Sequence, residues 1–427
     1  MAAGAAESPS VIARIPAIGL GRDAAVAAFV QDKLGFLLQA ARQYGPVVRL
    51  WPGVILVTGP AEVDIVIRRT NKDFLHDRNF MLRKTDHRPG SAHLAFWMKS
   101  RRAAIAGMTP SLLAEHTAWL AERTDAFATN WLRLGLIVGV PQQMQELTSA
   151  SIARFSFGTR NTADIPLAAE AMLDALLPIF AGPFEFPAYI RALQPREWQV
   201  KRKRRALESA LRSAAHSGGH GGLGEAIARQ GLNEEAAIHL LLILHLAGHG
   251  VPAAVLSWAL VELARNPEQQ EAAAAAAARW NGIGPAPDEI CWVVQETLRL
   301  WPPSWLVDRV TDASVECGTW TIPARSKLIL PLWAIHRLAD CYPEPERFDG
   351  GRWATLSPPP GTYLPYSSGP KWCLGARFAD AEITTILTVL LRRIRVSLRG
   401  EVQPDARRTL TPTGFQLLVE ARLAGRR

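Results

Sequence analysis

The chain has few cysteines and no apolar segment at its start. Its 427 residues include four cysteines, at positions 291, 317, 341 and 373, with no Cys-x-x-Cys pair and no regular spacing. This scarcity argues against a disulfide framework and fits a reducing compartment, so we expect a cytoplasmic protein. Residues 1–16 are alanine-rich and polar and lack the apolar run of a signal peptide or membrane anchor, which predicts a soluble protein.

The chain also lacks a Gly/Ser/Pro-rich linker and an internal repeat. Its hydrophobic content of 48% is enough for a large core, so we expect a single domain over residues 1–427. The formal net charge of +9 is compatible with nucleic acid, a membrane surface or an acidic protein as partner. The densest basic run, residues 201–205, lies in a helical pattern and is interpreted as a solvated helix face. We therefore expect a monomer without a nucleic-acid partner.

The pattern along the chain is mainly helical. Residues 46–60 predict two short strands around a Pro-Gly turn, and further short strands are expected within 314–335 and near 408–422. The helical bulk covers about 110–300 and includes a long apolar helix from Asn233, its N-cap, to a stop at Asn266. These patterns predict a mainly α fold with small β-sheets.

One cysteine stands in a distinctive loop. Residues 366–375 (Tyr-Ser-Ser-Gly-Pro-Lys-Trp-Cys-Leu-Gly) place Cys373 between Gly369 and Gly375, directly before a helical pattern over 376–391. Backbone amides and a helix N-terminus stabilise a thiolate, and glycines let the backbone approach a flat partner. Such a thiolate can be the axial ligand of a haem iron. The alternative for an isolated cysteine is an inert thiol buried in a turn.

The spacing aromatic, x, x, Gly, x, basic, x, Cys, x, Gly resembles the haem-binding loop of the cytochrome P-450 superfamily. Tyr366 stands where that family usually has Phe, and Lys371 where it usually has Arg or His. The resemblance implies a cytochrome P-450-like fold and haem b with Cys373 as axial ligand. It also implies electrons from NAD(P)H through a reductase and a ferredoxin, and the missing anchor favours a bacterial origin. A basic face suits such an acidic donor, and its candidates are Lys371, Arg377, Arg392 and Arg393.

A second motif places Glu296 and Arg299 three residues apart on one helix. An isolated pair of this kind contributes only a few tenths of a kcal/mol, but its context resembles the family's Glu-x-x-Arg helix. The family adds an arginine shortly before the cysteine loop, for which Arg347 and Arg352 are candidates. The fuller pattern Pro-x-x-Phe-x-x-x-Arg-Trp over residues 345–353 favours Arg352. The resemblance implies a structural role for these three charges.

His93, Trp97 and Arg101 recur at intervals of four residues and so share one helix face. An ordinary amphipathic helix is the alternative interpretation. The pattern Trp-x-x-x-Arg resembles the family's haem-propionate ligands, and Arg309 on a predicted strand matches a second one. We therefore expect Arg101 and Arg309 to bind propionates, with His93 and Lys371 as further candidates.

The long helix departs from the family pattern over residues 247–252 (Ala-Gly-His-Gly-Val-Pro). Gly250 and Val251 replace the acid and alcohol that help to relay protons during dioxygen activation in the family, and neither can do so. Gly248, Gly250 and Pro252 are also costly in a helix interior, at about 1 kcal/mol for each glycine and about 3 for proline. Because Pro252 leaves the Gly248 carbonyl without its helical donor, we expect a kink and a groove over the iron. Water or a substrate hydroxyl entering this groove would supply the missing protons.

Two histidines of the same helix offer alternatives. His249 could donate protons, although the family's variable position more often points away. His245 and His249 have a zinc-like spacing but lack a third ligand. The residues expected to face a substrate are nearly all apolar, which favours a terpenoid, polyketide, fatty or aromatic compound. They are Leu244, Ala247, Gly248, Val251, Trp305, Leu306, Val307 and Phe415.

Three functions stay open at this point. The first is a monooxygenase of bacterial specialised metabolism with substrate- or water-assisted proton delivery. The second is a haem-thiolate peroxygenase, isomerase or dehydratase that does not use dioxygen, and the third is a haem-binding partner or sensor with little turnover. Peroxide-using relatives typically have an arginine that holds a substrate carboxylate, and residues 244–255 contain none. That absence counts against a fatty-acid peroxygenase.

Overall fold

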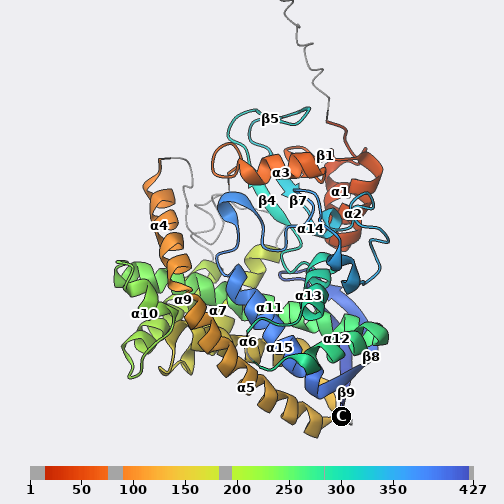
Figure 1. Ribbon diagram of the computed structural model, residues 1–427. Coiled ribbons are helices and arrows are strands. Elements are labelled where there is room, and N and C mark those ends of the chain that lie inside the picture. The colour runs from red at the N-terminus through yellow and green to blue at the C-terminus, as the bar shows by residue number, and fades with distance from the viewer. Residues whose placement is uncertain (1–14, 76–89, 182–194, 283, 423–427) are drawn as a thin grey trace, which may run out of the picture. The chain divides into compact units, whose positions relative to one another are not determined.

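The computed structural model describes residues 15–75, 90–181, 195–282 and 284–422. Its contacts divide the chain into two compact units. The sheet unit comprises Met1–Ala95, Leu306–Pro345 and Pro358–Trp372, and the helical unit comprises Phe96–Trp305, Glu346–Ser357 and Cys373–Arg427. Helices dominate the described part of the chain and the sheets are small, as the sequence predicted (Figure 1).

The sheet unit is built on a four-stranded sheet of order β1-β2-β7-β4. The predicted Pro-Gly turn joins β1 to the antiparallel β2, which pairs in parallel with β7, and β4 is antiparallel to β7. β5 and β6 form a separate hairpin. The elements are α1 Arg22–Gln31, α2 Lys33–Tyr44, β1 Val47–Trp51, β2 Val54–Val57, α3 Pro60–Arg68, β4 Val307–Val310, β5 Val315–Cys317, β6 Trp320–Ile322, β7 Lys327–Leu330, α14 Leu332–Ile335 and η3 Gly369–Lys371.

Branched aliphatic residues form the core of the sheet unit. Val47, Ile55 and Leu328 come from its strands, while Val63 and Val66 come from one face of α3, and all five are buried. β-branched side chains suit strands because they pack on a pleated surface. The core therefore fixes α3 against the sheet.

The helical unit surrounds one long helix, α11, that contacts α6, α9, α13 and α15 (Figure 1). The Asn233 side chain caps α11 by accepting from the Ala236 N–H at 2.9 Å, as expected. The helices are α4 Ala92–Gly107, which begins in the sheet unit, α5 Pro110–Leu134, α6 Val140–Phe157, α7 Asp164–Ala181, α9 Pro195–His216, α10 Leu223–Ala228, α11 Glu234–Arg265, α12 Pro267–Arg279, α13 Asp288–Leu300, η2 Gly350–Ala354 and α15 Ala376–Arg393.

α11 is long and apolar enough by length and composition to cross a membrane. Within the described residues, however, 72% of its most apolar window is buried inside the structure. This burial is what the central helix of a packed core shows. The helix also continues through Pro252 as one element.

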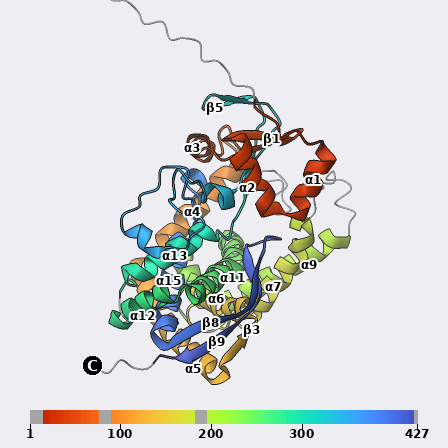
Figure 2. The ribbon, with the colours of Figure 1, turned by 90° about the vertical axis from the view of Figure 1, so that its right-hand side faces the viewer.

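A three-stranded antiparallel sheet of order β3-β9-β8 completes the helical unit. β3 spans Leu136–Val138, β8 spans Ile394–Asp405 and β9 spans Thr411–Ala421. Only the second arm of this hairpin was expected, because the region of β8 was not predicted as a strand. The hairpin lies beside α11 (Figure 2). The turn at 406–410 thereby lies against α11, where Trp258 Nε1 donates to the Leu410 carbonyl.

Candidate functional site

The candidate iron ligand, Cys373, is partly exposed. It is the first residue of the segment Cys373–Arg427 of the helical unit. Burial raises the pKa of the Cys373 thiol, while the Gly375 N–H and the nearby Arg101 cation lower it in part. The expected amide contribution is thus present but smaller than the cost of desolvation. A coordinating metal ion reverses this balance, because it deprotonates a thiol outright. The accessible sulfur and its two stabilising groups fit a metal ligand.

The two glycines of the loop have different roles. Gly369 has a φ of +60°, and a Cβ there would lie 3.1 Å from the carbonyl oxygen of Ile67 at the end of α3. Gly369 is therefore required by the turn and by this packing. A Cβ at Gly375 would meet nothing within 4 Å, which leaves the open space that a close planar partner needs.

The predicted propionate ligands of α4 lie on one side of that helix. The Arg101 guanidinium lies 4.8 Å from the Trp97 ring centroid, in a cation–π arrangement. Burial lowers the pKa of Arg101, and the Cys373 sulfur opposes this change. Trp97 and Arg101 thus belong to the surroundings of Cys373 in the helical unit. His93, one turn earlier, belongs to the sheet unit.

Arg309 on β4 is a fully buried cation, with 1% of its surface exposed. Its Nε donates to Thr70 Oγ1 at 3.0 Å and its Nη1 to the Asp308 carbonyl at 2.6 Å. Burial lowers the pKa of Arg309 to about 10. Among the described residues of the sheet unit, no carboxylate lies within ion-pair distance of this guanidinium. Its hydrogen bonds go to neutral acceptors, and the Asp308 carboxylate opposes the effect of burial only from beyond ion-pair distance. A buried charge without an ion pair is costly, so this environment fits an external anion such as a propionate.

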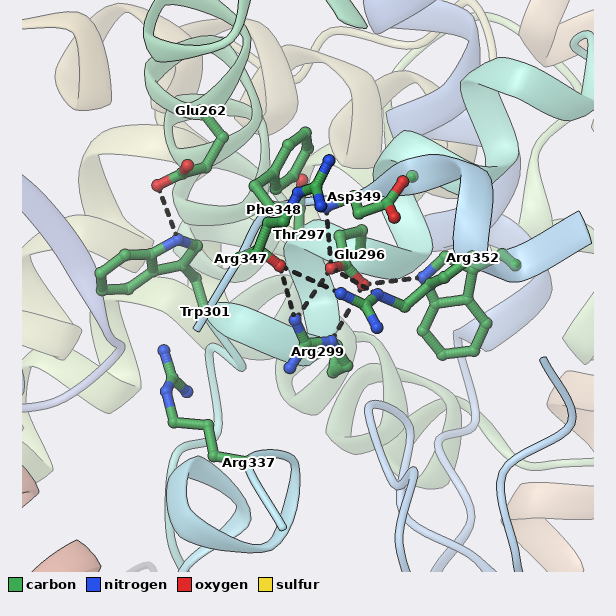
Figure 3. Close-up of polar contacts among 12 residues, drawn as sticks. Glu262, Glu296, Thr297, Arg299, Trp301, Arg337, Arg347, Phe348, Asp349 and Arg352 are labelled. Carbon is green, nitrogen blue, oxygen red and sulfur yellow. Dashed lines mark hydrogen bonds and ion pairs between the residues drawn. The ribbon is translucent and has the colours of Figure 1, made fainter. Parts of the chain in front are cut away.

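Glu296 is the centre of a buried ion-pair network on α13 (Figure 3). Glu296 and Arg299 are both completely buried, and the guanidinium binds the carboxylate twice, at 2.8 and 2.9 Å. Arg352 adds a third contact from its Nε at 3.0 Å. Arg347 contributes its backbone carbonyl to both arginines, at 3.2 and 3.3 Å. The longer sequence pattern therefore identified the arginine whose side chain reaches Glu296.

Two further donors complete the Glu296 network. Trp353 Nε1 donates to Oε2 and the Asp349 N–H donates to Oε1, both at 3.0 Å. The sequence pattern contained Trp353, but its indole was not recognised as a donor. The carboxylate is thus surrounded by donors, which is the condition for burying a charge without a large penalty.

The irregular part of α11 packs on α6. A Cβ at Gly248 would lie 3.2 Å from the Ile152 side chain, so this glycine permits close approach of the two helices. The Thr148 hydroxyl donates to the His249 carbonyl at 3.0 Å. These contacts help to offset the cost of glycine and proline in the helix. Sequence reasoning placed a groove over the iron here, and did not foresee the contribution of α6.

His249 points toward α6. Its ring nitrogens lie 2.7 Å from Ser149 Oγ and 2.9 Å from Gln145 Nε2. Burial, together with the Arg408 cation, lowers the pKa of His249 to about 4, although Asp174 opposes this effect. The imidazole is therefore neutral near pH 7.

His245 is fully buried beside Phe157, and burial lowers its pKa to about 3. Its Nε2 has no hydrogen-bond partner in the part of the chain that the structure describes. Within the same residues no cluster of three His, Cys, Asp or Glu side chains could hold a metal ion. The zinc-like spacing of the two histidines therefore gains no third ligand there.

One stripe of α11 is accessible. Ala247 is exposed and Ile243, Gly250 and Val251 are partly exposed, whereas their neighbours in the helix are mostly buried. These positions share one face at helical spacing. They include the two residues that replace the family's acid and alcohol, so the accessible stripe is where a ligand can meet this helix.

A guanidinium borders the stripe at the position of the missing acid. A Cβ at Gly250 would lie 3.5 Å from Arg408 Nη2 and 3.9 Å from Gln145 Oε1. Arg408 comes from the turn between β8 and β9. Residues 244–255 themselves contain no arginine, so the sequence of this part of α11 does not indicate the contact. The pair Arg407-Arg408 at a hairpin turn was the available signal.

The apolar candidates for substrate contact divide between the units. Leu306 and Val307 belong to the sheet unit, and the others belong to the helical unit. Trp305 is mostly buried and donates from Nε1 to the Arg408 carbonyl at 3.1 Å. Phe415 borders a cavity of about 710 Å³ next to the same turn. Leu244 is buried within α11, on the edge of the accessible stripe.

Comparison with known proteins establishes the family. Residues 194–419, more than half of the chain, match the family described as Cytochrome P-450. The chain therefore belongs to the cytochrome P-450 family, whose members bind haem through a cysteine thiolate. A six-coordinated cytochrome P-450 from Thermus thermophilus has the same fold, with a TM-score of 0.70 and 23% identity over 91% of this chain and 98% of that one.

The sequence relatives have a higher identity than this structure but match less of the chain. A Mycobacterium tuberculosis protein named cytochrome P-450 135B1 is 39% identical over 158 residues, which are 37% of this chain and 34% of the relative. The chain thus matches about a third of the length of such mycobacterial relatives. Cyclooctatin synthase from Streptomyces melanosporofaciens is 28% identical over 72% of this chain and 70% of its own.

Proposed function

We propose that the protein is a bacterial haem-thiolate monooxygenase that oxidises an apolar small molecule in specialised metabolism. The observation that carries this proposal is the partly exposed Cys373 sulfur, flanked by the Gly375 N–H and the Arg101 cation. Membership of the cytochrome P-450 family supports it. The similarity to a Streptomyces protein named for cyclooctatin synthesis supports a role in small-molecule metabolism.

The residues of this chain would hold haem b by its iron and its propionates. Cys373 would bind the iron through its sulfur, and Arg101 and Arg309 would supply the cations for the propionates. Arg309 is the stronger candidate, because it is buried and no carboxylate of the described residues of the sheet unit forms an ion pair with it. The bound haem supplies the oxidising chemistry that no side chain provides.

The electron donor is proposed to be a ferredoxin supplied by an NAD(P)H-dependent reductase. Arg377 is exposed close behind Cys373 and could attract an acidic partner. Arg393, also considered for this surface, is instead paired with Asp125 at 2.5 Å. Within the helical unit the proposed basic face therefore relies on Arg377 rather than on Arg393.

The test is the reduced, carbon-monoxide-treated protein. We expect the red-shifted Soret absorption of a thiolate-ligated haem in the wild type and its loss in Cys373→Ala. Cys341→Ala, which removes another partly exposed cysteine, should keep the absorption and serves as the matched control. Persistence of the shifted absorption in Cys373→Ala would exclude Cys373 as the ligand.

A peroxide-using enzyme is the second candidate, because the position of the missing acid is bordered by the Arg408 cation. This arrangement removes the objection that no arginine reaches this part of α11. Product formation with NADPH and a surrogate ferredoxin system should be compared with product formation with hydrogen peroxide alone, on one substrate panel. Product only with peroxide would exclude the monooxygenase.

A further inference from the structure

We propose that Arg408 recognises a carboxylate on an otherwise apolar substrate. The inference rests on the proposed haem-thiolate function, because it names the substrate class of that enzyme. It assigns a specificity-determining role to a residue far from α11 in the sequence. Four features of the helical unit support it, namely the anchored turn, the charge of the guanidinium, its position at Gly250 and the adjacent cavity.

The turn that carries Arg408 is held on two sides. Trp305 Nε1 donates to the Arg408 carbonyl at 3.1 Å, and the Leu410 N–H donates to the Pro303 carbonyl at 3.1 Å. On the α11 side, Trp258 Nε1 donates to the Leu410 carbonyl at 3.1 Å. These bonds fix the backbone from which the guanidinium extends, so that less conformational entropy is lost when it binds a ligand.

The Arg408 guanidinium is half-buried and keeps its charge. Burial lowers the pKa of Arg408, whereas Asp174 and Asp405 raise it. In the part of the chain that the structure describes, no carboxylate lies within ion-pair distance of Arg408. Its neighbour Arg407 differs, because it holds both oxygens of Asp405 at 2.6–3.0 Å. The Arg408 guanidinium can therefore form an ion pair with an external anion.

The guanidinium lies next to the accessible stripe of α11 at Gly250, which has no side chain. Arg408 Nη2 and Gln145 Oε1 are the described atoms within 4 Å of a Cβ built at Gly250, and only the first is charged. The neighbouring His249 is neutral because of its lowered pKa. A planar guanidinium binds a carboxylate through two parallel hydrogen bonds. A carboxylate reaching the stripe at Gly250 therefore meets one suitable cation.

The adjacent cavity fits a molecule that has both a carboxylate and an apolar body. Its volume of about 710 Å³ is in the range of small-molecule sites, about 300–1,000 Å³. Val138, Pro141, Pro412 and Phe415 provide apolar lining beside Arg408. Three arginines against two aspartates line it, so the net formal charge of its lining is positive, and it favours an anion (Arg399, Arg407, Arg408; Asp174, Asp405).

The experiment compares the binding of a carboxylic acid with the binding of its methyl ester to the haem-loaded protein. Samples are first shown to have the thiolate-type carbon-monoxide spectrum, so that failure of the haem assignment is detected separately. Isothermal titration calorimetry then compares dodecanoate with methyl dodecanoate, and abietate with methyl abietate. We expect the acid to bind at least about tenfold more tightly than its ester in one pair or both.

Substitutions assign the preference to one residue. Arg408→Gln should reduce it to about twofold or less, and Arg408→Lys, which keeps the charge without the planar fork, should give an intermediate value. Arg395→Gln removes an exposed cation from β8, outside the lining of the cavity, and should keep the preference. Equal binding of acid and ester, or no binding of either acid, in the wild type would overturn the proposal. So would a preference that survives Arg408→Gln, or that is lost equally in Arg395→Gln.

Discussion

Two arginine environments of the helical unit differ in whether a carboxylate of the chain pairs with the guanidinium. Arg299 is completely buried, yet its charge is matched by Glu296, which is also held by Arg352. Arg408 is only half-buried, but no carboxylate of the described residues forms an ion pair with it. The first arrangement is complete within the chain and locks α13 to the segment before the cysteine loop. The second lacks an anion, which is the property of a recognition site.

Two more buried charges extend the comparison. Arg309 in the sheet unit is a buried cation without an ion pair among the described residues of that unit, and we propose that it binds a haem propionate. Glu382 on α15 is a completely buried acid, and burial raises its pKa from the ordinary 4.5 to about 8. A carboxyl can escape the cost of burial by keeping its proton, whereas a guanidinium remains charged. Unmatched arginines are therefore more informative about ligands than unmatched acids.

The largest effect is expected at the matched pair. Glu296→Gln leaves Arg299 and Arg352 without their counter-charge and should destabilise the protein by about 3–5 kcal/mol. Urea denaturation followed by circular dichroism measures this change. Glu289→Gln, which removes an exposed pair with Arg279, should cost less than about 1 kcal/mol. Similar losses in both variants would show that the buried network is not special.

Arg309→Leu tests the unmatched cation of the sheet unit. The variant loses a charge that a propionate needs, so haem affinity should fall about tenfold or more. The ratio of haem to protein after gel filtration measures the loss. Lys327→Gln, which removes a partly exposed cation from β7, should retain its haem. Full haem content in Arg309→Leu would reject the assignment.

Glu382→Gln tests the neutralised acid. Between about pH 4.5 and 8 the folded state holds a proton that the unfolded state has lost, so stability should fall as pH rises through this window. The slope is at most about 1.4 kcal/mol per pH unit. The glutamine variant should lose this slope and be more stable than the wild type at pH 7.5. Parallel stability curves from pH 5 to 8 would contradict a protonated Glu382.

Gly250→Glu would give Arg408 a carboxylate partner within the chain, as Glu296 is for Arg299. The new carboxylate would pair with Arg408 and should weaken binding of an external carboxylate about tenfold. Gly250→Gln introduces a side chain of the same size without the charge and controls for steric exclusion. Calorimetry with dodecanoate distinguishes the two. Equal losses in both variants would point to steric exclusion rather than to charge.

Much of the fold was accessible from local sequence patterns. The strands around the Pro-Gly turn and the cap at Asn233 depend on neighbouring residues, and so they were predicted closely. Arg352 was chosen over Arg347 by a nine-residue pattern, and its side chain does reach Glu296. β8 was missed although Ile394, Val396 and Leu398 alternate with polar residues, which is a strand pattern. Only its register with β9 depends on a distant segment.

The candidate site was less accessible, because its contacts join distant segments. His249 was expected to point away from the site, and it does contact α6, but its partners Gln145 and Ser149 could not be named. Arg408 was missed because only the hairpin beside α11 brings it to Gly250.

The order of residues around Cys373 and Glu296 was enough to determine the family and the expected haem ligand, since these motifs are short and contiguous. Folding decided which charges are matched and which are not. Burial and ion pairing depend on segments that are far apart in the chain, and so the environment of Arg408 exists only in three dimensions.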